Sequence, residues 1–237
     1  MIGDTVHVWL IRPDLPPAVV AGLGRLLDAD ERRRVEALAF PDHRQHFIVA
    51  HGAVRSILAR HLGVAADEIR WSRGRHGKPE LAGASGPHVS ISHSDGVTML
   101  AVSGARRVGV DIQQLPRQFD AARMATRYFP LEEARYVADA GDPAAQTRRF
   151  ITLWARKEAC VKVVGGRLMQ GMALAVRAAD QPDHAGIVIH QPAGPIPGPY
   201  RLHDLPVTPR FRAAVAAEGV PEYQLARHHW RPQVTPP

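Results

Sequence analysis

The stretch F-I-T-L-W-A-R-K-E-A-C-V-K, residues 150–162, is followed closely by Gly165-Gly166 and decides how the rest of the chain is interpreted. Its apolar side chains recur at helical spacing, so one face of a helix should pack on a core before the glycine pair ends it. Glu158 and Lys162 lie one turn apart on another face. Such a pair is most often solvent-exposed and worth a few tenths of a kcal/mol, so this helix alone does not indicate a site. The apolar positions are Phe150, Leu153, Trp154, Val161 and Val164.

A second stretch, R-V-G-V-D-I-Q at residues 107–113, gives the Glu158–Lys162 pair a possible partner. Alternation predicts a strand whose polar face carries Asp111 and Gln113 side by side, above Gly109, which has no side chain. Aspartate is disfavoured in strands. An aspartate with free space beneath it suits a hard cation, or a phosphate carried by that cation. The alternative is a half-exposed strand that ends in a turn.

Together the two stretches resemble the signature of the 4′-phosphopantetheinyl transferase superfamily, and more narrowly its long single-chain Sfp type, which activates peptide synthetases. Three further segments match in the same order along the chain, and the resemblance covers about residues 30–168. These segments are Phe40-Pro41-Asp42 to Arg55, His76-Gly77-Lys78-Pro79, and Ser90-Ile91-Ser92-His93-Ser94.

The resemblance implies an α+β fold. We expect two similar α+β halves in one chain, related by a pseudo-twofold axis, with the active site in the cleft between them. The halves should span residues 1–110 and 111–230, and residues 231–237 should form a disordered tail. Because both halves lie in one chain, we expect a monomer.

The implied activity is that of an enzyme. It would transfer the 4′-phosphopantetheine group from coenzyme A to a serine of an apo acyl or peptidyl carrier protein, giving holo carrier protein and 3′,5′-ADP in a Mg²⁺-dependent reaction. Such carrier proteins are generally acidic, which suits the net charge of +7.

The implied catalytic residues are Asp111, Glu158 and Lys162. Asp111 and Glu158 would hold Mg²⁺, with Gln113 as a further ligand, because Mg²⁺ prefers one or two carboxylates together with phosphate oxygens and water. Glu158 would take the proton of the carrier serine, and Lys162 would stabilise the departing 3′,5′-ADP. Several family members have glutamate where this chain has Gln113, so the site carries one fewer negative charge.

The resemblance also implies a set of coenzyme-binding residues, with Lys162 among them and His93 at the 3′-phosphate. Arg34 is assigned by spacing, with Arg33 close behind it. Only three of the 30 basic residues are lysine, namely Lys78, Lys157 and Lys162, and all three fall inside the motifs. The coenzyme-binding set is Arg34, Arg73, Lys78, Ser92, His93 and Lys162.

Composition favours a globular protein, because 237 residues with 45% hydrophobic content supply a sizeable core. The single cysteine, Cys160, excludes an internal disulfide framework and fits a reducing compartment. Without a signal-peptide pattern or 18 uninterrupted apolar residues, we expect a soluble cytoplasmic protein that does not bind membranes.

Competing interpretations are weaker. Ser92, His93 and Asp95 invite a hydrolase triad, but neighbouring strand side chains point apart and G-x-S-x-G is absent. His43, His46 and His51 lack the acidic helper of a zinc motif. A basic nucleic-acid-binding module would suit the charge, yet aromatic residues make up only 6% and the arginines are spread along the chain, so we expect no nucleic acid. A degenerate homologue that binds coenzyme A without reacting stays open because of Gln113.

The remaining pattern predicts an ordinary succession of elements. Strands are expected at 5–11, 88–93, 97–102, 173–177, 187–190, 200–205 and 211–217, and helices at 17–27, 28–38, 43–62, 119–128 and 131–138.

Overall fold

Strands and helices both contribute to the core, so the expected mixed α+β fold is confirmed. The computed structural model describes residues 4–83, 86–177, 186–190 and 196–232. Within them the strands form two four-stranded sheets and a two-stranded ribbon. In sheet order, the first sheet contains β10 (Gln224–His229), β1 (Thr5–Ile11), β5 (Val97–Ser103) and β4 (His88–Ser94). The second contains β6 (Val108–Gln114), β9 (Phe211–Glu218), β8 (Tyr200–Leu205) and β7 (Ile187–Ile189), and the ribbon pairs β2 (Trp71–Arg73) with β3 (Pro79–Leu81).

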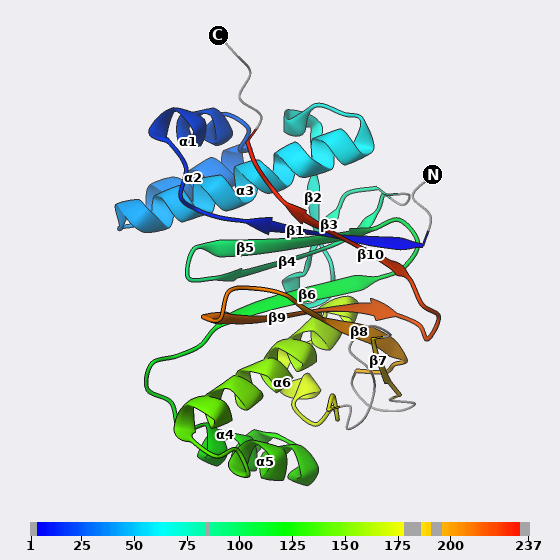
Figure 1. The fold of residues 1–237 in the computed structure, drawn as a ribbon. Helices are drawn as coiled ribbons and strands as arrows, with labels where there is room; N and C mark the ends of the chain where they lie inside the picture. The colour runs from blue at the N-terminus through cyan, green and yellow to red at the C-terminus, as the bar shows by residue number, and fades with distance from the viewer. Residues whose placement is uncertain (1–3, 84–85, 178–185, 191–195, 233–237) are drawn as a thin grey trace.

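Two 22-residue helices cover the outer faces of the two sheets (Figure 1). They are α3 (Pro41–Leu62) and α6 (Pro143–Val164), and each begins with a proline in its first turn and ends at a left-handed glycine. The smaller helices are α1 (Pro17–Gly24), α2 (Ala29–Ala37), α4 (Ala121–Tyr128), α5 (Leu131–Ala138) and α7 (Leu168–Gly171), with 3₁₀ turns at Ala66–Glu68 and Arg75–Gly77.

The layers follow the order helix, sheet, sheet, helix (Figure 1). One buried cluster lies between α3 and the first sheet, and another lies between α6 and the second sheet. A third joins the two sheets face to face, with Val8 and Met99 from the first and Val110 and Phe211 from the second. Because each sheet is buried on both sides, its central strands are buried at consecutive positions, as in β5 and β9.

Buried Arg55 on α3 connects this helix to α2, which precedes it, and to the segment that follows it. Its Nε donates to the Glu31 carboxylate at 2.6 Å, its guanidinium also pairs with Asp28, and it donates to the carbonyl oxygen of Ile69 at 3.1 Å. Asp28 and Glu31 form the capping box at the start of α2. The motif residue Arg55 therefore has a structural role.

The two sheets also meet along one edge, where β4 lies beside β6. The hydroxyl oxygens of alternate β4 residues accept hydrogen bonds from backbone N–H groups of β6. Ser90 accepts from Val110 at 3.1 Å, Ser92 from Ile112 at 3.3 Å and Ser94 from Gln114 at 2.9 Å. The two residues of each pair are 20 positions apart in the sequence, so the two strands run parallel. We call this contact the serine seam; it replaces a backbone ladder with side-chain hydroxyls.

The last strand, β10, was not expected from the sequence. It pairs in parallel with β1, so residues 224–229 complete the sheet that the first residues begin. The expected boundary between residues 110 and 111 stays a prediction; β6, which starts at Val108, lies in the second sheet. Of the tail expected at 231–237, residues 233–237 lie outside the described residues.

The expected strand at 173–177 is wrong. These residues are irregular, because their backbone polar groups bond to side chains instead of to a neighbouring strand. The carbonyl of Leu174 accepts from Lys157, and the N–H groups of Val176 and Arg177 donate to Glu133 at 2.6 and 2.9 Å.

Candidate active site

Close packing of β6 on α6 creates the site. A side chain at Gly109 would collide with the carbonyl oxygen of Ala159, and its Cβ would lie 2.7 Å from the backbone nitrogen of Val163. Only glycine lets the strand approach the helix this closely. The approach brings Asp111 of β6 to the face of α6 that carries Glu158 and Lys162.

Asp111 is the centre of a hydrogen-bonded cluster. Its side chain is 1% exposed, and Oδ1 accepts from Lys162 Nζ at 2.6 Å and from Ser92 Oγ at 2.8 Å. Lys162 Nζ also donates to Ser92 Oγ at 2.9 Å. The other oxygen, Oδ2, accepts from the Gln113 amide at 3.0 Å. Asp111 therefore directly contacts three other residues that the sequence predicted for the site, namely Ser92, Gln113 and Lys162.

Glu158 lies beside this cluster with its carboxylate uncommitted. It is half-buried and makes no hydrogen bond or ion pair to the described part of the chain. Burial and, to a lesser extent, the neighbouring Asp111 charge raise its pKa to about 7, while Lys162 opposes both. A carboxyl group near half-ionisation at neutral pH can both accept a proton and, when ionised, bind a cation.

Lys78 flanks the cluster at the C-terminal end of α6. Its Nζ donates to the carbonyl oxygens of Val108 and Val163, each at 3.2 Å. These bonds connect the loop between β2 and β3 to the start of β6 and the end of α6. Burial lowers its pKa to about 8. Lys78, Ser90 and Lys162 line a hollow of about 210 Å³ that is closed by Gly165 and Gly166.

His93 lies on β4 in a separate hollow of about 380 Å³. Its Nδ1 hydrogen-bonds the Thr98 hydroxyl at 2.9 Å. The His93 residue is exposed to solvent. Much of its ring is nevertheless surrounded by protein atoms, because the ring forms part of the wall of the hollow. This loss of water, followed by the charges of His51 and Lys162, lowers its pKa to about 4. At neutral pH the imidazole is therefore uncharged.

Three further histidines line the same hollow, and the sequence analysis did not assign them to the site. They are His43, His46 and His51, all on α3, where the i, i+3 and i+8 spacing from His43 was the available signal. His51 connects the hollow to the capping network, because its Nδ1 lies 3.0 Å from a Glu31 oxygen.

The structure does not bring Arg34 or Arg73 to the Asp111 cluster. Both side chains are exposed, and neither hydrogen-bonds nor pairs with another described residue. Neither lines any of the three hollows discussed in this section. Their coenzyme-binding role stays a prediction.

Lys157 faces away from the site. Its Nζ is fully buried and lies 2.6 Å from a Glu133 oxygen and 4.7 Å from the centre of the Phe129 ring. Of the three motif lysines, this one anchors α6 in the core, whereas Lys78 and Lys162 line the hollow.

The donor set at Asp111 fits a magnesium ion better than a zinc ion. No three His, Cys, Asp or Glu side chains in the described ranges could hold a metal ion together. Asp111, uncommitted Glu158 and the Gln113 amide nevertheless offer two carboxylates and one neutral oxygen, a set that leaves room for phosphate and water ligands.

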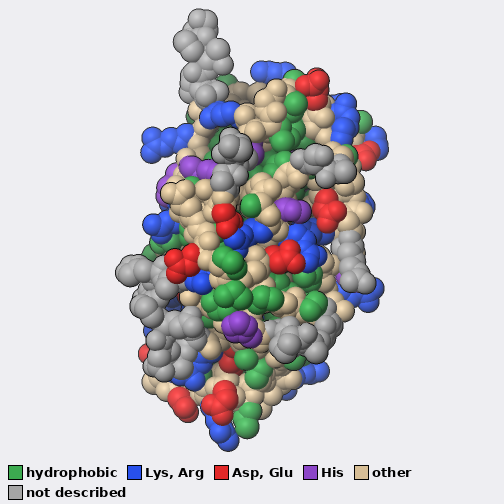
Figure 2. Space-filling view, turned by 90° about the vertical axis from the view of Figure 1, so that its right-hand side faces the viewer, with side chains coloured by type: hydrophobic (Ala, Val, Ile, Leu, Met, Phe, Trp, Pro, Cys, Tyr) green, Lys and Arg blue, Asp and Glu red, His purple; other side chains and the backbone are tan. Residues whose placement is uncertain are grey.

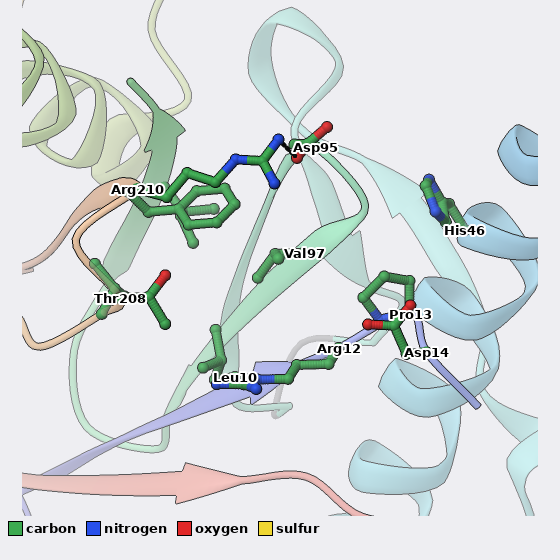
Figure 3. Close-up of a pocket in the computed structure, with 12 residues that line it drawn as sticks. Leu10, Arg12, Pro13, Asp14, His46, Asp95, Val97, Thr208 and Arg210 are labelled. Atoms are coloured by element: carbon green, nitrogen blue, oxygen red, sulfur yellow. Dashed lines mark ion pairs between the residues drawn. The ribbon is translucent and has the colours of Figure 1, made fainter. Parts of the chain in front are cut away.

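A larger hollow of about 410 Å³ lies away from these residues (Figure 3). It opens between the end of β1, the β4–β5 turn and the loop before β9. Asp95 and Arg210 pair across one side at 2.7 Å, and His46 stands on the other. None of the residues predicted for the site lines it.

Comparison with known proteins decides the family. The family model described as the 4′-phosphopantetheinyl transferase superfamily matches residues 107–216. The 4′-phosphopantetheinyl transferase HetI of Nostoc sp. is 32% identical over 168 residues, which cover 70% of this chain and 70% of the relative. The chain belongs to the 4′-phosphopantetheinyl transferase superfamily.

Two further relatives of this transferase are less similar in sequence. The 4′-phosphopantetheinyl transferase Sfp of Bacillus subtilis is 28% identical over 156 residues, covering 60% of this chain and 67% of the relative. The L-aminoadipate-semialdehyde dehydrogenase-phosphopantetheinyl transferase of Homo sapiens is 26% identical over 154 residues, covering 60% and 49%.

The residues matched by the superfamily model, 107–216, include only some of the residues of the site. Asp111, Gln113, Glu158 and Lys162 lie within residues 107–216, whereas Lys78, Ser92 and His93 lie before them. The geometry of this transferase therefore adds Ser92 to the cluster independently of the family model.

Neither a hydrolase triad nor a membrane-spanning helix is found in the described residues of the transferase. The Ser92 hydroxyl bonds to Asp111 and Lys162, and His93 bonds to Thr98, so they do not form a hydrolase triad. Basic side chains are scattered among acidic ones on the face shown in Figure 2. Within the ranges described, no helix combines the length and apolar character of a membrane span.

Proposed function

We propose that this transferase moves the 4′-phosphopantetheine group of coenzyme A to a serine hydroxyl of an apo acyl or peptidyl carrier protein. The products would be holo carrier protein and 3′,5′-ADP. The observation that carries the proposal is the cluster of Asp111, Lys162 and Ser92 beside the uncommitted Glu158. Attack of a hydroxyl on a pyrophosphate needs charge neutralisation and positioning more than covalent help, and this cluster supplies both.

Asp111 and Glu158, with the Gln113 amide oxygen, would hold Mg²⁺. When bound, the ion neutralises charge on the pyrophosphate of coenzyme A. Gln113 donates an amide N–H to Asp111, so a rotation of the amide would be needed to turn its oxygen toward the ion. The neutral amide in place of a carboxylate predicts weaker metal binding than a three-carboxylate site would give.

Glu158 would act as the general base. Its pKa of about 7 leaves a large fraction ionised at neutral pH, and no protein hydrogen bond must break before it accepts the serine proton. Lys162 would donate to the phosphate oxygen that becomes negative as 3′,5′-ADP departs, because its side chain is 28% exposed and lines the hollow that Lys78 also lines.

Further parts of the proposal rest on the resemblance. Lys78, His93, Arg34 and Arg73 would contact coenzyme A, and the acidic surface of the carrier would complement the net charge of +7. The layered pair of sheets, each covered by a 22-residue helix, supports two related halves with a pseudo-twofold axis. The monomeric state and the cytoplasmic location stay predictions.

The test is intact mass spectrometry of apo carrier proteins incubated with coenzyme A and Mg²⁺. We expect the mass of one phosphopantetheine to be added, and the addition to be lost with EDTA and with Glu158→Gln. Glu132→Gln, an exposed glutamate on the neighbouring α5, is the matched control and should retain transfer. Binding of coenzyme A without transfer to any acyl or peptidyl carrier would instead identify a degenerate homologue.

A further inference from the structure

Asp111 already has a cationic partner within the protein. This residue is 1% exposed, and both of its carboxylate oxygens accept hydrogen bonds. Oδ1 accepts from Lys162 Nζ at 2.6 Å and from Ser92 Oγ at 2.8 Å, and Oδ2 accepts from the Gln113 amide at 3.0 Å. Of these three donors only Lys162 carries a charge. A divalent metal ion at Asp111 and the Lys162 ammonium are therefore rival cations for one carboxylate.

The charges of the residues around Asp111 nearly cancel. Asp111 contributes one negative charge, and Glu158, with a pKa of about 7, contributes roughly half a charge at neutral pH. Lys162 contributes one positive charge, and the Gln113 amide contributes none. The affinity of an oxygen site for a divalent cation depends on the charge of its ligands, so this balance favours weak metal binding.

Lys162 has a second place to go. It lies in the last turn of α6, its side chain is 28% exposed, and it lines the hollow of about 210 Å³ together with Lys78. A lysine ammonium is a compact charge on a flexible stem, so it can turn from the carboxylate to a phosphate oxygen in this hollow. Asp111 has no such freedom, because it is buried in the middle of β6.

We propose that Lys162 is an internal counter-ion, which opposes metal binding at Asp111 until coenzyme A draws its ammonium away. This inference rests on the proposed function and gives Lys162 a role in addition to stabilising the leaving group. A coenzyme phosphate that accepts from Lys162 removes the rival cation, so the metal and the coenzyme bind cooperatively, and the coupling is reciprocal. Direct contact between the metal and the pyrophosphate also couples them, so the test must isolate the part that depends on Lys162.

The experiment measures Mn²⁺ binding to the full-length protein, with and without saturating coenzyme A and in the absence of any carrier protein. Mn²⁺ takes the same oxygen ligands as Mg²⁺, and its unbound form is quantified by electron paramagnetic resonance. A pH of 8 keeps Glu158 mostly ionised. Lys162→Met removes the charge and the hydrogen bonds, Lys162→Gln removes the charge and keeps a donor for Asp111, and Lys162→Arg keeps the charge. Arg148→Gln is the control, because it removes an exposed charge about 21 Å away along α6.

We expect Mn²⁺ to bind the coenzyme-free Lys162→Met and Lys162→Gln proteins at least about tenfold more tightly than the parent. Coenzyme A should then enhance Mn²⁺ binding by a correspondingly smaller factor in these variants. Lys162→Arg and Arg148→Gln should keep the affinity and the enhancement of the parent. If Lys162→Met fails to fold, as judged by circular dichroism, Lys162→Gln decides the question.

Two results would overturn the inference. Equal Mn²⁺ affinities of the coenzyme-free parent and the neutral Lys162 variants would show that the ammonium does not oppose the metal. An equal gain in Arg148→Gln would show that only the net charge of the protein matters. Failure of the proposed function looks different, because a parent that shows the expected coupling but transfers nothing to any carrier contradicts the transfer and supports the role of Lys162 in metal binding.

Discussion

Lys157 and Glu158 are adjacent on α6, but their side chains lie in different environments. Lys157 is fully buried against Glu133, whereas Glu158 lies beside Asp111 and Lys162, because successive helix positions point about 100° apart. The sequence placed both in one motif and assigned only Glu158 to the site, but it did not show that Lys157 is buried. The partner that decides the matter, Glu133, lies on another helix and carries no sequence signal of pairing.

Breaking the buried pair should destabilise the protein without touching the chemistry. Lys157→Met leaves the Glu133 carboxylate buried without a counter-charge, so we expect a loss of about 3 kcal/mol in the free energy of unfolding, measured with urea. The double variant Lys157→Met, Glu133→Gln should recover most of this loss, because the amide oxygen can still accept the N–H groups of Val176 and Arg177. Loss of kcat in this restored protein would contradict the structural role of Lys157.

Glu158 should destabilise the folded protein at pH values at which its carboxyl group is ionised. Its folded-state pKa of about 7 lies above the value of about 4.5 for an exposed carboxyl group, so the folded state binds more protons between these pH values and stability falls as pH rises through them. We expect Glu158→Gln, measured without metal, to raise the free energy of unfolding by about 1 kcal/mol at pH 8, after allowance for its partial exposure. At pH 4 the variant and parent should agree; equal stability at pH 8 as well would show that the carboxyl group is not destabilised by its surroundings.

The contacts within the site were predictable in part. Alternation along residues 108–113 and helical spacing along 150–162 placed Asp111, Gln113, Glu158 and Lys162 on the correct faces, and the resemblance indicated that the faces meet. The Ser92 contact could not be derived, because it depends on how two sheets approach along their edges. Local sequence periodicity carries no information on that approach.

At the scale of elements, the pairing of β6 with α6 decides whether a site exists. Gly109→Ala places a methyl group against the backbone of Ala159 and Val163, which cannot yield without moving the helix. We expect a loss of about 2–3 kcal/mol in the free energy of unfolding, together with lower transfer activity. Gly141→Ala is the control, since its added Cβ meets nothing within 4 Å, and it should change stability little. Similar losses for both variants would contradict the close approach.

The elements that the sequence predicted are those with a strong periodic pattern. The opening strand, the hairpin of β4 and β5, and β8 were located well by alternation. Residues 173–177 also alternate, yet their backbone bonds to Lys157 and Glu133, which overrides the pattern. β10 was missed because its sequence, Q-L-A-R-H-H, is polar and lies at a sheet edge that buries little of it.

At the scale of the molecule, β10 brings three histidines together at the join between the two chain ends. His7 Nδ1 lies 3.0 Å from His228 Nε2, and the His61 ring centre lies 5.7 Å from that of His7. Burial lowers the pKa of all three, and for His7 the charges of His228 and His61 lower it further. Their neutral forms are therefore the ones that the fold accommodates.

This cluster predicts acid sensitivity. Because the folded-state pKa values lie below 6.5, the unfolded chain binds more protons, and the stability that these histidines contribute is present at pH 7.5 and lost as pH falls through 6.5. We expect urea denaturation to show a smaller loss between pH 7.5 and 5.5 for His228→Gln than for the parent. His229→Gln, at the adjacent exposed position, should behave like the parent; an equal loss in all three proteins would contradict the prediction.

The parallel pairing of β1 with β10 has a consequence for synthesis on the ribosome. β1 comprises residues 5–11 and meets its partner β5 once residues 97–103 have emerged, but the partner on its other edge is made only at residues 224–229. For roughly the second half of translation the nascent chain therefore carries an open β1 edge, with unpaired N–H and C=O groups able to recruit another strand. Ribosomal pausing before β10 should expose this protein to aggregation more than pausing after it, independently of whether the Asp111 cluster has already formed.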